Sequence, residues 1–186
     1  MNLRRKIRNI RRSLSPDYTE YAAVAAAKIL TGHTLFHQAR RIASYIAADG
    51  ELSPHLLNTL AWRYNKLLAV PKLKSFDTRL WFVEHKITDK MHINKFNIPE
   101  PYKTKLIATW SLDLVLVPLV AFDRRGNRLG MGGGFYDKTF ELNKHFYKRP
   151  KLVGLAHSFQ EVTKLEPEPW DVPLNAIVTE KELIIC

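Results

Sequence analysis

The sequence predicts a single α/β domain, a three-layer type of sandwich in which helices flank a largely parallel β-sheet. The first observation is alternation, because short apolar runs of strand length are separated along the chain by segments with helical periodicity. The second is size, since 186 residues with 46% hydrophobic and 11% aromatic content suffice for one large core. The third is continuity. No repeat or Gly/Ser-rich linker divides residues 1–186, so one domain is expected.

The first segment is expected to form an amphipathic helix. Its apolar residues recur at the spacing of one helix face, namely Leu3, Ile7, Ile10 and Leu14. The other face would carry basic residues, namely Arg4, Arg8 and either Arg11 or Arg12. Their guanidinium groups are therefore expected to project together.

A second helix start follows directly. Ser15 can cap the helix, Pro16 suits its first turn and Asp17 complements the helix dipole. The Ala-rich segment behind this signal predicts a helix that ends near Gly32.

A βα unit comes next. Residues 41–47 predict a strand closed by the turn-like pair Asp49-Gly50, and Ser53-Pro54 begins another helix. Residues 135–146 predict a helix among the later strands. Further strand candidates occupy residues 67–70, 80–84, 113–120, 152–156 and 176–179. Ligands of such sheets bind beyond the carboxyl ends of the strands, where Glu51 and a glycine-rich segment both fall.

That glycine-rich segment points to a phosphate site. Five of the eight glycines lie within residues 126–134. Without a Cβ, successive main-chain N–H groups can converge into a nest for an anion. Phosphate would sit at the start of the following helix, with Arg124, Arg125 and Arg128 beside it. The spacing matches neither Gly-x-x-x-x-Gly-Lys-Ser/Thr nor Gly-x-Gly-x-x-Gly, and a tight turn without a ligand is the alternative.

The charge distribution bears on partners. Lysine and arginine exceed aspartate and glutamate by 29 to 18, a formal net charge of +11 that attracts anions. The basic residues of the first 16 positions are not accompanied by an acid, whereas six acids lie in the last 26. Because a polyanion binder usually spreads its basic surface more widely, we expect no nucleic acid partner. A basic nucleic-acid-binding module is the alternative from another class.

The single cysteine and the lengths of the apolar runs indicate the cellular compartment. A lone cysteine, Cys186, excludes an intrachain disulfide and fits a reducing compartment. No apolar run reaches membrane-spanning length and no apolar signal core follows the N-terminus, so the expected location is cytoplasmic, without a membrane partner. The Arg-rich, acid-free start also fits a mitochondrial presequence.

An ordered set of motifs resembles the 5-formyltetrahydrofolate cyclo-ligases, also called methenyltetrahydrofolate synthetases. Arg128–Asp137 is similar to that family's signature, and residues 96–101 look like its Ile-Pro-Glu-Pro segment. Residues 117–123 precede the loop as in the family, and residues 171–175 resemble its C-terminal Asp-x-Pro motif. With the basic first helix, the resemblance spans essentially the whole chain.

This resemblance implies an α/β enzyme that uses ATP and Mg²⁺ to convert 5-formyltetrahydrofolate to 5,10-methenyltetrahydrofolate, releasing ADP and phosphate. The small-molecule folate is the expected partner of a monomer or weak dimer. Nucleotide contacts are implied in the first helix and the glycine loop, namely Arg4, Arg8, Arg128, Leu129, Gly130, Met131, Gly132, Gly133, Gly134, Phe135 and Tyr136. Arg128 and Tyr136 are the expected catalytic residues.

Folate and metal contacts are implied elsewhere. The resemblance points to Ile46, Glu51 and Tyr136 for folate, and we add Trp110 as a wall for its rings. Asp137 and Asp171 match positions assigned to Mg²⁺ in the family, and oxygen ligands suit that cation. Each also has an ordinary structural explanation: Glu51 as a turn acid, Asp137 as a helix-dipole partner, and Ile46 and Trp110 as packing.

Three positions depart from the family pattern. Met131 stands where the loop commonly has arginine, Leu119 replaces a common glycine, and Asn175 replaces a frequent aspartate. The missing cation at Met131 motivates a third hypothesis, a catalytically weak homologue that binds folate and ATP.

Overall fold

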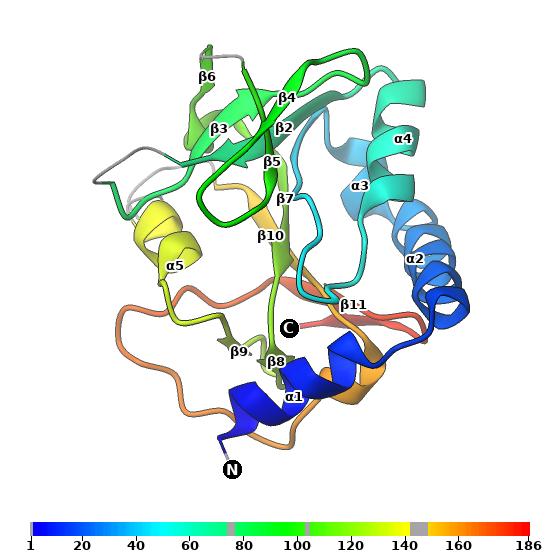
Figure 1. Cartoon of the computed structure of the whole chain (residues 1–186), viewed down its shortest axis with the longest axis vertical. Coiled ribbons are helices and arrows are strands. Elements are labelled where there is room, and N and C mark those ends of the chain that lie inside the picture. Colours follow the sequence, from blue (N-terminus) through cyan, green and yellow to red (C-terminus); the bar gives the residue numbers. More distant parts are fainter. Residues whose placement is uncertain (1, 74–76, 103–104, 142–148) are drawn as a thin grey trace.

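A large β-sheet forms the centre of the molecule, as the computed structural model in Figure 1 shows. The structure describes residues 2–73, 77–102, 105–141 and 149–186. Within them, eight strands form this sheet in the order β12-β11-β10-β7-β1-β2-β3-β6. Their bounds are β1 Arg41–Ala43, β2 Leu67–Lys72, β3 Trp81–Glu84, β6 Leu106–Ile107, β7 Leu114–Pro118, β10 Lys151–Leu155, β11 Ala176–Val178 and β12 Leu183–Ile185.

The centre of this sheet is parallel. β7 pairs in parallel with β1 and β10, and the parallel pairing continues to β2 on one side and β11 on the other. The outer strands β12, β3 and β6 pair antiparallel. The predicted α/β fold with a largely parallel sheet is therefore confirmed. The strand predicted over residues 41–47 is shorter in the structure, because β1 ends at Ala43.

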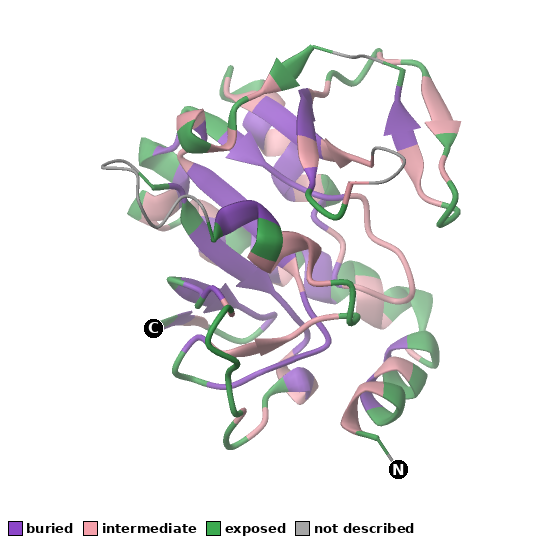
Figure 2. Ribbon diagram, turned by 90° about the vertical axis from the view of Figure 1, so that its left-hand side faces the viewer, coloured by how far each residue is buried: buried purple, intermediate pink, exposed green. Residues whose placement is uncertain are grey.

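Helices cover both faces of the sheet (Figure 1). They are α1 Leu3–Arg12, α2 Pro16–Thr31, α3 Thr34–Gln38, α4 His55–Arg63 and α5 Phe135–Phe140. Side chains of β7 alternate between two hydrophobic layers, because neighbours in a strand point to opposite faces. Leu114 and Leu116 join the core beneath α2, α3 and α4, whereas Val115 and Val117 join the core that includes Phe140 of α5. Figure 2 shows the buried strands between these layers.

The start of α2 forms as its sequence predicts. The Ser15 side chain accepts a hydrogen bond of 3.2 Å from the Tyr18 N–H, and Pro16 occupies the first helical position. Gly32 follows the last residue as the C-cap. None of the described helices is long and apolar enough to cross a membrane.

The predicted faces of α1 were partly wrong. Ile7 is buried as expected, but Ile10 is 38% exposed and Arg11 is only 1% exposed. A buried guanidinium group is stable only when its donors are satisfied, and Arg11 finds acceptors on two distant segments. Those partners are far away in sequence, so helical periodicity could not predict the exchange.

Several short elements had no sequence signal. β4 (Met91–Ile93) and β5 (Pro99–Pro101) form a hairpin between the strands predicted over residues 80–84 and 113–120, where no element was predicted. β8 (Ala121–Phe122) and β9 (Arg128–Leu129) form another before the glycine loop. Of the helix predicted over residues 135–146, α5 is described as far as Phe140, and residues 142–148 lie outside the described part.

The topology brings two loops together. β1 and β7 are parallel neighbours, so the chain segments that leave their carboxyl ends emerge at one edge of the sheet. The first segment carries Glu51, and the second leads through β8 and β9 into the glycine loop. α1 lies across this edge, at the bottom of Figure 1 beside β8 and β9.

Candidate functional site

The glycine loop connects β9 to α5. Gly132 has a φ of 101° and Gly134 a φ of 64°, a backbone region that glycine adopts without strain. A Cβ placed on Gly130 would have no heavy atom within 4 Å, so its open side faces free space. Gly134 is the N-cap of α5 and lacks a side chain to satisfy the first helical N–H groups. The loop therefore presents accessible main chain.

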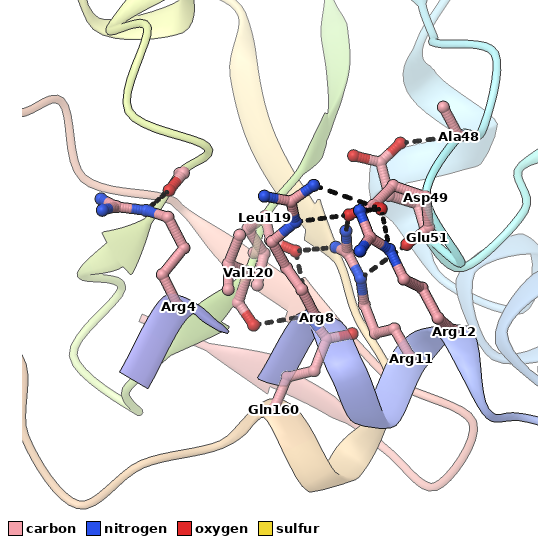
Figure 3. Close-up of polar contacts among 11 residues, drawn as sticks. Arg4, Arg8, Arg11, Arg12, Ala48, Asp49, Glu51, Leu119, Val120 and Gln160 are labelled. Atoms are coloured by element: carbon pink, nitrogen blue, oxygen red, sulfur yellow. Dashed lines mark hydrogen bonds and ion pairs between the residues drawn. The ribbon is translucent and has the colours of Figure 1, made fainter. Parts of the chain in front are cut away.

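Basic side chains lie against this loop. Arg4 of α1 donates a hydrogen bond of 2.8 Å from Nε to the Gly130 carbonyl, which Figure 3 shows. A Cβ on Gly132 would lie 3.9 Å from Arg4 Cζ, and one on Gly134 would lie 3.9 Å from Lys138 Nζ. The first helix thus contacts the loop, although Arg4 and Gly130 are 126 positions apart in the sequence.

Arg128 and Asp137 are partners of one another. The buried Arg128 guanidinium group donates through Nη2 to Asp137 Oδ1 and through Nη1 to the Val172 carbonyl. The same Asp137 oxygen accepts a hydrogen bond of 3.1 Å from the Val172 N–H. A proposed phosphate-binding cation and a proposed metal ligand are therefore joined, and together they tie α5 to the segment after Asp171.

Asp171 stands beside this pair. Its Oδ2 accepts a hydrogen bond of 2.9 Å from the Glu168 N–H. Arg128, Asp171 and Val172 help to line a hollow of ≈ 200 Å³. No group of three or more His, Cys, Asp or Glu side chains that could hold a metal ion occurs in the described part of the chain.

Asp49 collects three guanidinium groups from α1 (Figure 3). Its Oδ2 lies 2.7 Å from Arg8 Nε and 2.8 Å from Arg11 Nη2, and its Oδ1 binds Arg12. Burial alone would raise the pKa of Asp49, but the three hydrogen bonds outweigh it and lower the pKa to about 2. Arg8, predicted to contact the nucleotide, is thus held at Asp49.

Glu51 lies two residues further along, close to two tyrosines. Burial raises the pKa of Glu51 to about 7, although a 3.1 Å hydrogen bond from the Ala48 N–H and the charge of Arg11 oppose the rise. Burial raises the pKa values of Tyr45 and Tyr136, and the Glu51 charge raises both further. The carboxyl group and both phenols therefore interact electrostatically.

The other predicted site residues lie around this centre. Tyr136 is in the first turn of α5, two residues after Gly134, and Ile46 is half-buried in the segment between β1 and Asp49. Trp110 is 54% exposed in a short 3₁₀ helix, Thr109–Ser111, so it is a surface residue and not core packing.

The remaining residues of the loop lie at its two ends and on its surface. Leu129 ends β9, and Met131 is 47% exposed on the loop. Phe135 begins α5, and its ring packs edge to face on the ring of Phe96 in the β4–β5 hairpin, with 6.4 Å between the ring centroids. The hairpin tip therefore packs against the start of α5. Gly133 leaves room for Phe135, because a Cβ there would lie 2.7 Å from its ring.

Sequence reasoning missed four residues of the site. Lys138 could have been found, because it lies four positions after Gly134 and so one turn along the same helix. Asp49 was recognised only as a turn residue, Tyr45 only as part of a strand, and Arg11 only as one of a basic face. Their roles depend on contacts between segments that no local pattern records.

Comparison with known proteins agrees with this geometry. Residues 1–180 match the 5-formyltetrahydrofolate cyclo-ligase family. The 5-formyltetrahydrofolate cyclo-ligase of Escherichia coli (strain K12) is 36% identical over 180 residues, covering 95% of this chain and 98% of the relative. The Haemophilus influenzae protein of the same name is 39% identical over 184 residues, covering 94% and 96%.

Solved structures show the same likeness in three dimensions. The NMR structure of Aquifex aeolicus 5,10-methenyltetrahydrofolate synthetase has a TM-score of 0.83 at 29% identity, covering 98% of this chain and 90% of that one. A Mycoplasma pneumoniae 5,10-methenyltetrahydrofolate synthetase has a TM-score of 0.76 at 25% identity, covering 96% and 97%. The match over nearly the full length, joined to a glycine loop that shares one sheet edge with Glu51, shows that the chain belongs to the 5-formyltetrahydrofolate cyclo-ligase family of ligases.

Proposed function

We propose that this protein uses ATP and Mg²⁺ to convert 5-formyltetrahydrofolate to 5,10-methenyltetrahydrofolate, with release of ADP and phosphate. The observation that carries the proposal is that α1 contacts both loops at one edge of the sheet. Arg4 donates a hydrogen bond to the Gly130 carbonyl, and Arg8 binds Asp49, two residues before Glu51. A triphosphate on the glycine loop and a pterin beside Glu51 would therefore lie next to one another.

The chemistry requires activation of a poor electrophile. The formyl carbon of an amide-like group resists attack, and its oxygen is a poor leaving group. In the proposed reaction that oxygen attacks the γ-phosphorus while the bond to ADP breaks. The neighbouring folate nitrogen then attacks the carbon, loses its proton, and phosphate departs with the former formyl oxygen. Such a transfer is accelerated by alignment and by neutralised charge.

The protein's groups fit those two tasks. Main-chain N–H groups of residues 130–134 would bind phosphate oxygens, since a Cβ on Gly130 would meet only open space. Arg4 and Lys138 lie against the loop and would balance the phosphate charge. The Glu51 carboxylate would accept hydrogen bonds from the donor-rich pterin ring. Arg128 and Tyr136 remain our candidates for direct contact with the reacting groups.

Asp137 and Asp171 are the residues that would hold Mg²⁺. Both supply carboxylate oxygen, the donor that this cation prefers, and Asp171 lines a hollow beside the Arg128–Asp137 pair. Because the described residues form no larger cluster, nucleotide oxygens and water must complete the shell, as is usual for Mg²⁺ with nucleotides. When bound, the ion would neutralise charge on the phosphates.

The direct test is to mix the purified protein with ATP, Mg²⁺ and 5-formyltetrahydrofolate and to follow the methenyl product by its absorbance. ATP-dependent product from the native chain would also reject the hypothesis that Met131 makes it a weak, binding-only homologue. Absence of product together with absence of ATP and folate binding would refute the proposal.

A pair of glycine variants tests the loop itself. Gly130→Ala adds a methyl group in open space, so the melting temperature should stay unchanged while the KM for ATP rises about tenfold or more, because the methyl group keeps phosphate from the main chain. Gly126→Ala is the control. Its Cβ would lie 2.6 Å from the Leu174 carbonyl oxygen at a φ of 86°, so stability should fall and the KM for ATP should not change. An unchanged KM for ATP in Gly130→Ala would contradict the proposed role.

A further inference from the structure

Arg11 is a buried cation that neither the nucleotide nor the folate proposal uses. Its side chain has 0% exposure, and it makes three hydrogen bonds with two separate segments. Nε donates to the Asp49 carbonyl at 3.1 Å and Nη2 donates to Asp49 Oδ2 at 2.8 Å. Nη1 donates to the Leu119 carbonyl at 3.0 Å. Figure 3 shows the guanidinium group between these acceptors.

The first segment that Arg11 holds is the turn before Glu51. Asp49 and Gly50 both have positive φ, 54° and 72°. For a residue other than glycine such a conformation is costly and persists only where the surroundings hold it. The turn also rests on the α1 backbone, because a Cβ on Gly50 would lie 2.6 Å from the Arg11 carbonyl oxygen. Arg11 therefore binds both the main chain and the side chain of the turn that leads to Glu51.

The second segment leads to the glycine loop. Leu119 follows β7, and the N–H of the next residue, Val120, donates a hydrogen bond of 2.7 Å to the Leu129 carbonyl. Leu129 immediately precedes Gly130. A single hydrogen bond therefore connects the Leu119–Val120 peptide to the residue before Gly130, so a shift of this peptide would also move Gly130.

We propose that Arg11 is a positioning residue that holds the Glu51 turn and the glycine loop at a fixed separation, so that folate and nucleotide are aligned for the transfer between them. The inference rests on the proposed function and extends it to a residue that touches neither ligand. α1 would then act at two points, with Arg4 at the loop and Arg11 between the two segments.

Loss of Arg11 leaves most of its partners satisfied, which makes the role testable. The Leu119 carbonyl still accepts a hydrogen bond of 2.9 Å from Gln160 Nε2, and the Asp49 carboxylate still binds Arg8 and Arg12. Arg11→Gln should therefore remain folded. What it loses is the bridge from one segment to the other.

Arg12→Gln is the matched control, because Arg12 is the next residue of α1 and binds the same carboxylate. Unlike Arg11, its side chain is 54% exposed, and its described hydrogen bonds do not include one to Leu119. For Arg11→Gln we expect a rise of about tenfold in the KM for 5-formyltetrahydrofolate and a smaller rise in the KM for ATP, the scale of one lost charge-assisted hydrogen bond. For Arg12→Gln both KM values should stay within about twofold of the native ones, as expected for an exposed ion pair.

Melting temperatures and titrated active-site concentrations separate this role from a structural one, because partial unfolding lowers the apparent kcat and leaves KM unchanged. Unchanged KM values in folded Arg11→Gln, or equal effects in the two variants, would overturn the inference. Arg11→Lys supplies the test if Arg11→Gln does not fold, since one ammonium group cannot span both segments and should give the same pattern. A native protein that yields no product and binds neither ATP nor folate refutes the proposed function instead.

Discussion

At the scale of single residues, Glu51 is the one that would link the fold to folate recognition under the proposed function. The chain places this carboxyl group where burial raises its pKa to about 7, from an ordinary value of 4.5. Near neutral pH the group is therefore divided between its acid and its carboxylate. A carboxylate accepts hydrogen bonds from a pterin, whereas the acid has one oxygen committed as a donor. Folate affinity should accordingly depend on pH near neutrality.

Replacing Glu51 tests this link through stability as well as affinity. Between pH 4.5 and about 7 the folded protein binds the proton that the unfolded chain has lost, so native stability falls as pH rises through this window. Glu51→Gln removes that penalty. We expect its free energy of unfolding to exceed the native one by about 2–3 kcal/mol above pH 7 and to match it below pH 4.5.

Urea unfolding at several pH values gives that difference, and steady-state kinetics give its counterpart. The native KM for 5-formyltetrahydrofolate should fall as pH rises from about 6 to 8, whereas Glu51→Gln should show a higher KM without this trend. Equal stabilities of the two proteins at every pH would show that Glu51 titrates as an ordinary turn acid.

At the scale of elements, three arginines of α1 bind a single carboxylate. Asp49 binds Arg8, Arg11 and Arg12, and these contacts lower its pKa to about 2 from an ordinary 3.8. A lowered pKa means that the stabilisation is fully present above pH 3.8 and is lost as pH falls through 2. The docking of the first helix should therefore fail in acid before the sheet does.

Asp49→Asn should reproduce that failure at neutral pH. We expect the free energy of unfolding to fall by about 2 kcal/mol at pH 7, the difference to shrink below pH 4 and the KM for ATP to rise because Arg4 is no longer held at the loop. Glu161→Gln is the control, since it removes an acid from the exposed Arg124 and should cost less than about 0.5 kcal/mol. Denaturant unfolding and ATP kinetics of both variants decide the matter. A loss that persisted at pH 2 would contradict the electrostatic explanation.

The whole molecule shows what sequence can and cannot predict. The parallel centre of the sheet was predictable because β7 and its neighbours are apolar runs buried on both faces. The start of α2 was predictable because its cap residue lies next to the helix in the sequence. The glycine loop was equally visible, as its residues are contiguous. The role of Arg11 was not, because its acceptors lie 38 and 108 positions away. Two-residue strands such as β9 lack the length to show a period.

Several of the basic side chains that contribute to the net charge of +11 are not free to bind a ligand. Several arginines, buried or exposed, pair with acids of the same chain: Arg8, Arg11 and Arg12 with Asp49, Arg124 with Glu161 and Glu182, and Arg128 with Asp137. A nucleic-acid-binding module would need those groups free along one face. Internal pairing therefore favours a compact anion site over a polyanion surface.

Salt dependence separates these two uses of positive charge. A protein that neutralises six to ten phosphates loses about 10³–10⁵ in affinity between 50 and 200 mM salt, because each contact releases counterions. We expect a labelled nucleic acid duplex to bind weakly at about 50 mM salt and not measurably at about 200 mM, while the Kd for ATP with Mg²⁺ changes less than about tenfold over the same range. Fluorescence anisotropy for the duplex and calorimetry for ATP provide the two curves. Tight duplex binding that survives 200 mM salt would show instead that the arginines of α1 leave Asp49 to meet a polyanion, and the basic-module hypothesis would then stand.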